Sequence, residues 1–165
     1  MKNSFYDVRC CPENPKWEQC IKREIPIYSR NNDIRSDFER DYTRILHCDA
    51  YRRLKHKTQV FYAPHNDHIC TRMEHVMHVA SVANTIAKYL GLNQDLSQAI
   101  AIGHDIGHAP FGHSGEDILN DLLGKKEGAN APKKFWHERN SLFFADFIET
   151  LDDPNGIKRP LNLTY

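Results

Sequence analysis

The spacing of apolar side chains along the chain predicts a mainly helical fold. The clearest segment covers residues 71–90, where apolar residues recur every three or four positions, as on the buried face of an amphipathic helix. These residues are Val76, Val79, Ala80, Val82, Ala83, Ile86, Ala87 and Leu90. Gly91 follows directly and is typical of a helix C-cap, so we expect a long helix that ends at Leu90.

Four further helices are predicted by similar spacing combined with capping residues. Their expected bounds are Asp33 or Ser36 toward Leu54, Asp95 through Ile102, Ser114 through Leu123, and Trp136 to about Leu151. Only residues 57–62 have a strand-like pattern, and Pro64 ends that segment. The expected fold class is therefore all-α.

The chain divides into two parts on the same grounds. We expect residues 1–32 to be an irregular N-terminal segment, because three prolines interrupt it, and residues 33–165 to form one helical domain. Within that domain, residues 103–115 resemble a loop rich in glycine and histidine. Residues 124–134 are typical of a linker, and residues 152–156 of a turn.

Composition narrows the class of protein. The chain has 165 residues, with 22 basic and 22 acidic side chains. No segment is apolar over the length of a transmembrane helix, and the N-terminus lacks a signal-peptide core, so we expect a cytoplasmic protein without a membrane partner. Residues 1–72 hold 14 basic and 10 acidic groups, and the remainder 8 and 12. The basic part and the acidic part could lie on either side of a phosphate group and its metal ion. Alternatively, they are two solvent-exposed surfaces that differ in charge.

The five cysteines give a separate indication of compartment. Their number is odd and no CxxC motif occurs, which favours free thiols in a reducing cytoplasm over a disulfide framework. A zinc site formed by Cys10, Cys11 and Cys20 is not supported by the usual ligand spacing.

Histidine is the unusual residue of this sequence. There are ten, and nine of them lie between His47 and His113. Five of the ten belong to three short motifs, which are Thr71–His78, Gly103–His108 and Phe111–Glu116. A single histidine is most often an ordinary core or surface residue, but a cluster in this order indicates metal or proton chemistry.

The middle motif has the composition of a metal site. His104 and Asp105 would place an imidazole nitrogen and a carboxylate oxygen side by side, and His75 on a neighbouring helix would supply a third ligand. Mixed nitrogen and oxygen ligation suits Mn, Fe, Co, Ni, Zn or, more weakly, Mg, and leaves positions for water and phosphate. His78, three residues after His75, is a candidate neighbour of the site.

A zinc site of the HExxH type is the simplest alternative for the same motif. His104 and His108 have the required spacing, but the carboxylate between them belongs to an aspartate. Gly107 and Pro110 also disfavour a continuous helix, which that motif requires.

The motifs together resemble those of the deoxynucleoside triphosphate triphosphohydrolases, the dGTPase branch of the HD-domain metal-dependent phosphohydrolases. The resemblance begins near Ser36 and extends to the end of the chain. The matching segments are Arg40–His47, Tyr51–Leu54, Lys57–Phe61, Thr71–His75, Gly103–Glu116, Trp136–Ser141 and Leu161–Thr164. The segment from Gly103 to Glu116 is the most specific of them.

This resemblance implies an HD-domain helical core and hydrolysis of a dNTP to a deoxynucleoside and triphosphate, with a divalent metal and a homo-oligomeric assembly. It implies that the metal ligands are His75, His104 and Asp105. It implies that His113 is catalytic, with Glu116 as its carboxylate partner. The implied substrate-binding residues are Gln59, Arg72, His108 and His137, and Arg52 is a further cation suited to phosphate.

The resemblance departs from the family pattern in one respect. The family's HD signature is completed by a second, distant aspartate from a later helix, and Asp146, Asp152 and Asp153 do not match its setting. We therefore expect a helical core that is incomplete at the C-terminus, with exposed apolar surface and self-association.

Two alternative functions stay open at this point. One is an HD phosphohydrolase that acts on another nucleotide, such as a nucleoside monophosphate or a cyclic dinucleotide. The other is a truncated, non-catalytic module that binds nucleotides or single-stranded nucleic acid, which the lysine-rich residues 125–134 motivate.

Overall fold

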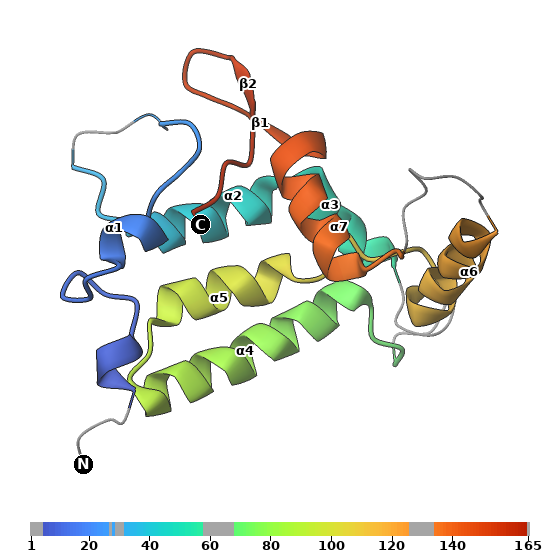
Figure 1. The fold of residues 1–165 in the computed structure, drawn as a ribbon, viewed down its shortest axis with the longest axis horizontal. Helices are drawn as coiled ribbons and strands as arrows, with labels where there is room; N and C mark the ends of the chain where they lie inside the picture. Colours follow the sequence, from blue (N-terminus) through green and yellow to red (C-terminus); the bar gives the residue numbers. More distant parts are fainter. Residues whose placement is uncertain (1–4, 27, 29–31, 58–67, 126–133, 165) are drawn as a thin grey trace.

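The structure is a computed structural model that describes residues 5–26, 28, 32–57, 68–125 and 134–164 (Figure 1). Helices dominate this part of the chain, which confirms the expected helical fold class. The α-helices are α1 (Trp17–Cys20), α2 (Asp37–His47), α3 (Asp49–Arg53), α4 (Arg72–Leu90), α5 (Gln94–Gly103), α6 (Gly112–Gly124) and α7 (His137–Phe143). Shorter elements are the 3-10 turns η1 (Tyr6–Val8) and η2 (Leu54–His56), and the π-helical η3 (Phe144–Ile148).

Two short strands accompany the helices. β1 (Thr150–Asp152) and β2 (Lys158–Pro160) pair antiparallel, with Leu151 opposite Arg159. The expected turn over residues 152–156 lies between them, where the Asp153 amide donates to Ile157 O and the Gly156 amide to Asp153 O.

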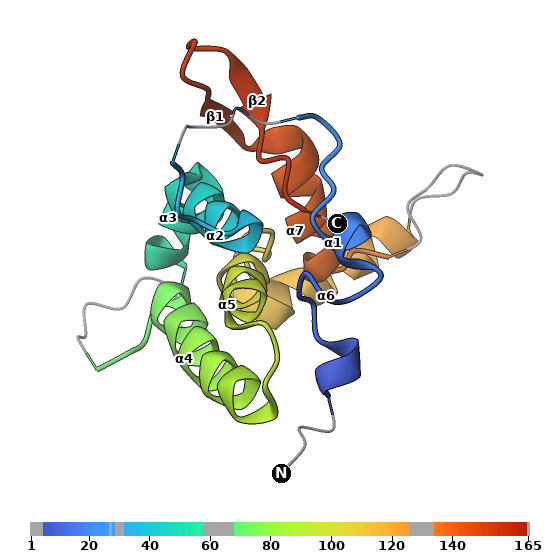
Figure 2. The same cartoon turned by 90° about the vertical axis from the view of Figure 1, so that its left-hand side faces the viewer.

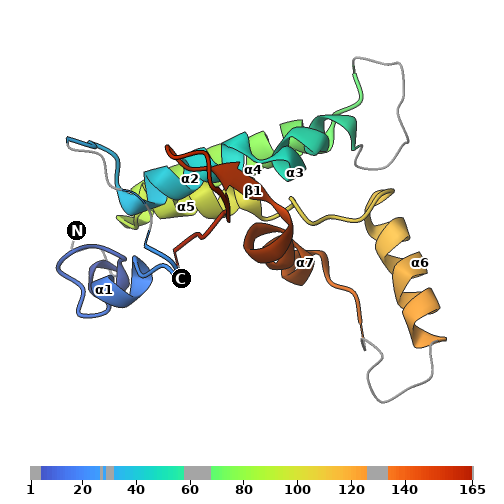
Figure 3. The same ribbon diagram turned by 90° about the horizontal axis from the view of Figure 1, so that it is seen from above.

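The body of the molecule is a layer of three long helices. α5 lies between α2 and α4 and packs against both, and α6 stands at the edge of the molecule (Figures 1 and 3). Figure 2, which looks along this layer, shows α2 and α4 on either side of α5. The buried core gathers residues from α2, α3, α4, α5 and the C-terminal segment. Its members are Ile45, Cys48, Ala50, Tyr51, Leu54, Val76, Ile102, Ile106, Ala145 and Leu161.

Local capping interactions explain where the two longest predicted helices begin. Ser36 and Glu39 form a reciprocal capping box at α2, and Thr71 and Glu74 form one at α4. Gly91 ends α4 with a left-handed φ of 71°, as expected. The predicted helix over residues 71–90 is therefore confirmed.

Other predicted bounds were wrong in their details. The helix beginning near Ser36 does not continue to Leu54, because Cys48 adopts an extended conformation between α2 and α3 and caps the latter. The N-cap of α5 is Asn93, whose side chain accepts the Leu96 amide, and not Asp95. Ser114 is inside α6, which begins after Phe111 in a left-handed conformation.

The helix predicted from Trp136 to Leu151 is shorter. It widens into a π-helical turn after Phe143 and ends at Ile148, so that Leu151 lies in a strand. The strand-like residues 58–62 and most of the expected linker lie outside the described residues.

The last residues of the chain return to α2. The Arg44 Nε donates to Leu161 O at 2.5 Å, and the Thr164 amide donates to Asp41 Oδ2 at 3.0 Å. The N-terminal segment joins the same place, because Arg23 pairs with Asp41 at 2.5 Å and donates to Asn162 O at 2.8 Å. These contacts tie both ends of the described chain to one helix.

Exposed apolar side chains, which the sequence also predicted, are present on α4, α5, α6, α7 and η3. Tyr89 is 81% exposed and Ile100 61%. A cavity of about 530 Å³ runs between α4, α5 and the N-terminal segment, and His104 contributes to its lining. None of the described helices is long and apolar enough to cross a membrane.

Candidate functional site

The three expected metal ligands lie together where α4 and α5 converge. His75 is in the first turn of α4, and His104 and Asp105 directly follow α5. One potential ligand atom from each residue lies within 4.8 Å of the other two. The packing of α4 on α5 thus brings together two imidazoles and a carboxylate from positions about thirty residues apart in the sequence.

Hydrogen bonds orient these ligands. His104 Nδ1 lies 2.7 Å from the carbonyl oxygen of Ala101, which leaves Nε2 to face Asp105 Oδ1 at 3.4 Å. Such a backbone contact fixes the ring and the tautomer of a metal-binding histidine. The donor set and spacing fit a divalent cation, with two nitrogen ligands and one oxygen ligand.

Arg72 contacts one member of the candidate metal triad His75, His104 and Asp105. Its Nη1 donates to Asp105 Oδ2 at 2.7 Å, and both side chains are buried. Burial alone would raise the pKa of Asp105, but the Arg72 hydrogen bond and the nearby positive charges outweigh it, so this pKa lies below its usual range. Arg72 therefore contacts the carboxylate of an expected metal ligand, and the phosphate contact that the resemblance implies stays a prediction.

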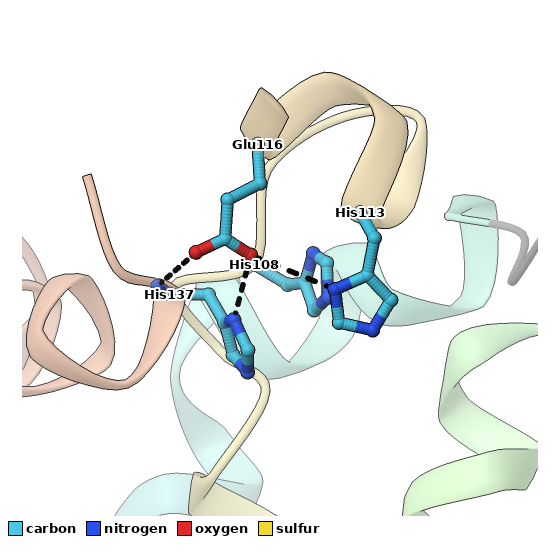
Figure 4. A group of neighbouring side chains, drawn as sticks. All are labelled: His108, His113, Glu116 and His137. Carbon is cyan, nitrogen blue, oxygen red and sulfur yellow. Dashed lines mark hydrogen bonds and ion pairs between the residues drawn. The ribbon is translucent and has the colours of Figure 1, made fainter. Parts of the chain in front are cut away.

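A second group of histidines forms just beyond the turn at Gly107. It consists of His108, His113, Glu116 and His137, whose potential ligand atoms also lie within 4.8 Å of one another (Figure 4). Glu116 Oε2 lies 2.9 Å from His137 Nδ1 and 3.7 Å from His113 Nδ1. The same carboxylate oxygen therefore lies close to two imidazole rings, an arrangement that suits proton transfer at either ring.

The members of this second group differ in exposure. The His113 side chain is 79% exposed, whereas Glu116 is 13% exposed and His108 is buried. The ring of His108 stacks on that of His137 with centroids 4.5 Å apart, and its Nε2 is buried without a hydrogen-bond partner in the described structure. Burial and the positive charge of Arg72 lower the pKa of His108 to about 4, so this ring is neutral at physiological pH.

Helix α7 connects the two groups. Ser141 Oγ lies 2.8 Å from His104 O and accepts the Gly107 amide at 3.0 Å, while Asn140 Nδ2 donates to Gly107 O at 2.6 Å. The loop that holds His104, Asp105 and His108 is thus fixed to the helix that begins with His137. The sequence drew attention to Trp136–Ser141 as a motif but assigned no role to Asn140 or Ser141.

Two further residues near the second group were also missed. The partly buried Lys57 donates from Nζ to His108 O at 2.8 Å, and Glu138 Oε1 lies 3.5 Å from His137 Nε2. Lys57 and Glu138 belong to segments quoted for the family resemblance, and that membership was the only available signal in the sequence.

The remaining predicted substrate-binding residues stand apart. Arg52 is on α3, with a 60% exposed side chain that pairs with Asp49 at 3.6 Å, and none of its contacts in the described part of the chain involves either histidine group. Gln59 lies outside the described residues. His78 is exposed on α4.

Comparison with known proteins agrees with this arrangement. The model of the HD domain family matches residues 72–157, which begin at α4 and include both histidine groups. This chain belongs to the HD domain family. Its two histidine groups and the loop between them lie wholly within the matched segment.

The relatives define the branch more narrowly. The chain is 51% identical over 133 residues to a deoxyguanosinetriphosphate triphosphohydrolase-like protein of Caldanaerobacter subterraneus subsp. tengcongensis, covering 81% of this chain and 35% of that protein. Proteins of the same description from Desulfatibacillum aliphaticivorans and Clostridium tetani are each 47% identical, over 80% and 86% of this chain and 34% and 38% of their own length. The expected resemblance is confirmed, and the chain spans about a third of the length of these curated relatives.

Proposed function

We propose that this chain carries the metal triad and the proton-transfer group of a phosphohydrolase that converts a deoxynucleoside triphosphate to a deoxynucleoside and triphosphate. The observation that carries the proposal is the placement of the triad and the His113–Glu116–His137 group on the two sides of one short loop. The printed names of the relatives support a dNTP as the substrate.

The triad would hold a divalent cation through His75, His104 and Asp105. When bound, the cation supplies positive charge for an oxygen of the α-phosphate and lowers the pKa of a coordinated water. Arg72 keeps Asp105 ionised, because it donates a hydrogen bond to the carboxylate oxygen that faces away from His104. His104 is held in a single tautomer by Ala101 O.

The second group supplies the proton. Hydrolysis at the α-phosphorus forms a bond from phosphorus to the water oxygen and breaks the bond to the sugar O5′. The O5′ must leave with a proton, and an imidazolium at His113 or His137 can donate it. Glu116 Oε2 lies within ion-pair distance of Nδ1 of both rings, at 2.9 Å from His137 and 3.7 Å from His113. His108, which is neutral and buried, can donate or accept a hydrogen bond to the triphosphate but carries no charge there.

The test is product analysis with the purified chain, Mn²⁺ and dGTP. We expect ³¹P NMR to show inorganic triphosphate, and we expect His113→Gln and Glu116→Gln to reduce the rate at least about 100-fold, the usual range for a general acid or base. His78→Gln is the matched control on the exposed face of α4 and should retain the wild-type rate. Release of pyrophosphate or single phosphate in place of triphosphate would contradict the proposal.

The extent of the functional unit also belongs to this proposal. We infer that residues 33–165 act as one helical domain with residues 1–32 as a separate N-terminal segment. Homo-oligomerisation, single-stranded nucleic-acid binding, a cytoplasmic location and the identity of the metal stay predictions. Sedimentation at several protein concentrations checks the first of these.

A further inference from the structure

One ring nitrogen of the second histidine group has no partner that the structure describes. Nδ1 of His108 lies 3.3 Å from the carbonyl oxygen of Ala109, whereas Nε2 is buried and makes no hydrogen bond within the described residues. Only 3% of His108 is exposed. A buried polar atom of this kind is costly to leave unsatisfied, so it indicates a ligand, and a metal ion is one that imidazole nitrogen binds well.

The other three members of the group lie around the same point. The ring of His108 has its centroid 4.5 Å from that of His137 and 5.3 Å from that of His113. Figure 4 shows the Glu116 carboxylate directed toward the rings of His113 and His137. One potential ligand atom from each of the four residues lies within 4.8 Å of the others. Ligands of a tetrahedral zinc ion are about 3.3 Å apart, so small side-chain movements would bring all four onto one ion.

These four residues come from three separate segments. The loop after α5 supplies His108, α6 supplies two members, and α7 begins with His137. Glu116 Oε1 lies 3.3 Å from the main-chain amide of His137, which donates to it and orients the carboxylate, as outer contacts do at metal sites. Asn120 adds a second link between α6 and the segment before α7, because its Oδ1 accepts the Phe135 amide at 2.6 Å. A cation in the group would therefore join the loop, α6 and α7.

The kinds of ligand in this group distinguish it from the metal triad. Three imidazoles and one carboxylate favour Zn²⁺, whereas Mn²⁺ and Mg²⁺ prefer sites richer in oxygen. Four protein ligands also fill every position of a tetrahedral ion, as in structural zinc sites. The triad offers three ligands and so leaves a position for water or phosphate. A metal held by all four members of the second group would therefore not be arranged to activate water.

We propose that the second histidine group is a Zn²⁺ site, separate from the metal triad, with all four of its residues as ligands. Bound Zn²⁺ takes the nitrogen lone pairs of His113 and His137, so neither ring can carry the proton that leaves with O5′. The ion therefore holds the chain in an inactive state and fastens α6 to α7. The inhibitory effect rests on the proposed function, whereas the binding of Zn²⁺ does not.

The test uses the full chain with His75→Ala and Asp105→Asn, which together remove the triad. After EDTA treatment, Zn²⁺ is titrated into this chain in competition with a chromophoric chelator. We expect His137→Gln to weaken Zn²⁺ binding at least about tenfold, because loss of even an outer partner of a metal ligand costs that much. Asp117→Asn is the matched control, since it removes an exposed carboxylate next to Glu116, and it should weaken binding less than about twofold. Zn²⁺ held by cysteine thiols would respond to neither substitution.

Two further measurements separate binding from folding and from activity. Co²⁺ in place of Zn²⁺ should give the strong visible absorption of a tetrahedral site, and His108→Gln should remove it while the far-UV circular dichroism is unchanged. Amide hydrogen exchange over residues 114–120 of α6 should slow when Zn²⁺ is added. Equal Zn²⁺ affinities of His137→Gln and Asp117→Asn would overturn the inference, even if the wild-type chain releases triphosphate from dGTP. Zn²⁺ binding that depends on His137, in a chain that releases no triphosphate, would support the site and contradict only the proposed function.

Discussion

The amide nitrogen of Gly107 lies 3.0 Å from the hydroxyl oxygen of Ser141, and a Cβ atom on Gly107 would lie only 2.2 Å from the Ser141 main-chain nitrogen. No side chain fits between the loop and α7 at this point. We expect Gly107→Ala to lower the free energy of unfolding by at least about 2 kcal/mol, because backbone must move to accept the methyl group. Urea denaturation measures this change.

Gly124→Ala is the control for that substitution. Nothing lies within 4 Å of a Cβ at Gly124, at the end of α6, so this change should be neutral or stabilising by up to about 1 kcal/mol. Equal effects of the two substitutions would show that the close approach at Gly107 does not constrain the loop.

A second prediction concerns the hydroxyl group of Ser141. Ser141→Ala leaves the buried Gly107 amide without its acceptor, which costs about 1–3 kcal/mol of stability. The same loss should reduce any metal-dependent activity, because the loop holds His104 and His108. Ser81→Ala on the exposed face of α4 is the control, and a similar loss there would contradict the assigned role.

A third prediction follows from the low pKa of His108. The unfolded chain protonates this ring near pH 6.5, whereas the folded chain does so only at about 4. Between these values the unfolded state binds more protons, so stability falls as the pH decreases from about 6.5 toward 4. His108→Gln should flatten this dependence by about 1–3 kcal/mol in urea titrations.

The same shift can be followed directly. In a ¹H NMR titration, the His108 ring should remain neutral at pH 5.5, below the pH at which an unperturbed histidine becomes protonated. A midpoint for His108 at or above 6.5 would contradict the structure.

A fourth prediction concerns metal binding by the triad. Addition of Mn²⁺ to the EDTA-treated chain should raise the melting temperature, because a ligand that binds only the folded state stabilises it. His75→Ala and Asp105→Asn should abolish the increase, whereas His78→Ala, one turn away on α4, should retain it. An undiminished increase in His75→Ala would place the cation elsewhere.

The sequence was sufficient to predict the helical fold, the bounds of α4 and the candidate triad His75, His104 and Asp105, whose side chains lie together in the structure. That these residues bind a metal stays a prediction. The apolar pattern of α4 and its capping residues Thr71 and Gly91 depend on residues close together in the sequence. They can therefore be recognised without knowledge of the tertiary structure. The triad could be expected because the order of His75 and His104-Asp105 matched a known motif. Its closeness in space is a result of the packing of α4 against α5, which spacing alone does not provide.

The rest depended on contacts between distant segments. The role of Ser141 arises from its position against Gly107, and the role of Lys57 from a carbonyl fifty-one residues away. The break at Cys48 and the π-helical turn after Phe143 likewise reflect tertiary packing, since neither has a glycine or proline to announce it. Residue type and spacing carry little information about such contacts.

The contacts between the termini and α2 have a consequence for the order in which the protein folds during synthesis. The contact that joins the loop to α7 links Gly107 and Ser141, which are 34 residues apart in the sequence. The contacts with α2 and the N-terminal segment span longer stretches, since Arg44 and Leu161 are 117 residues apart and Arg23 and Asn162 are 139 residues apart. The longer loops add little to the entropic cost of loop closure, about 0.6 kcal/mol for each doubling of loop length. The decisive factor is the time at which each residue leaves the ribosome. Both histidine groups can therefore assemble on the nascent chain before Leu161 and Thr164 emerge to fasten α2.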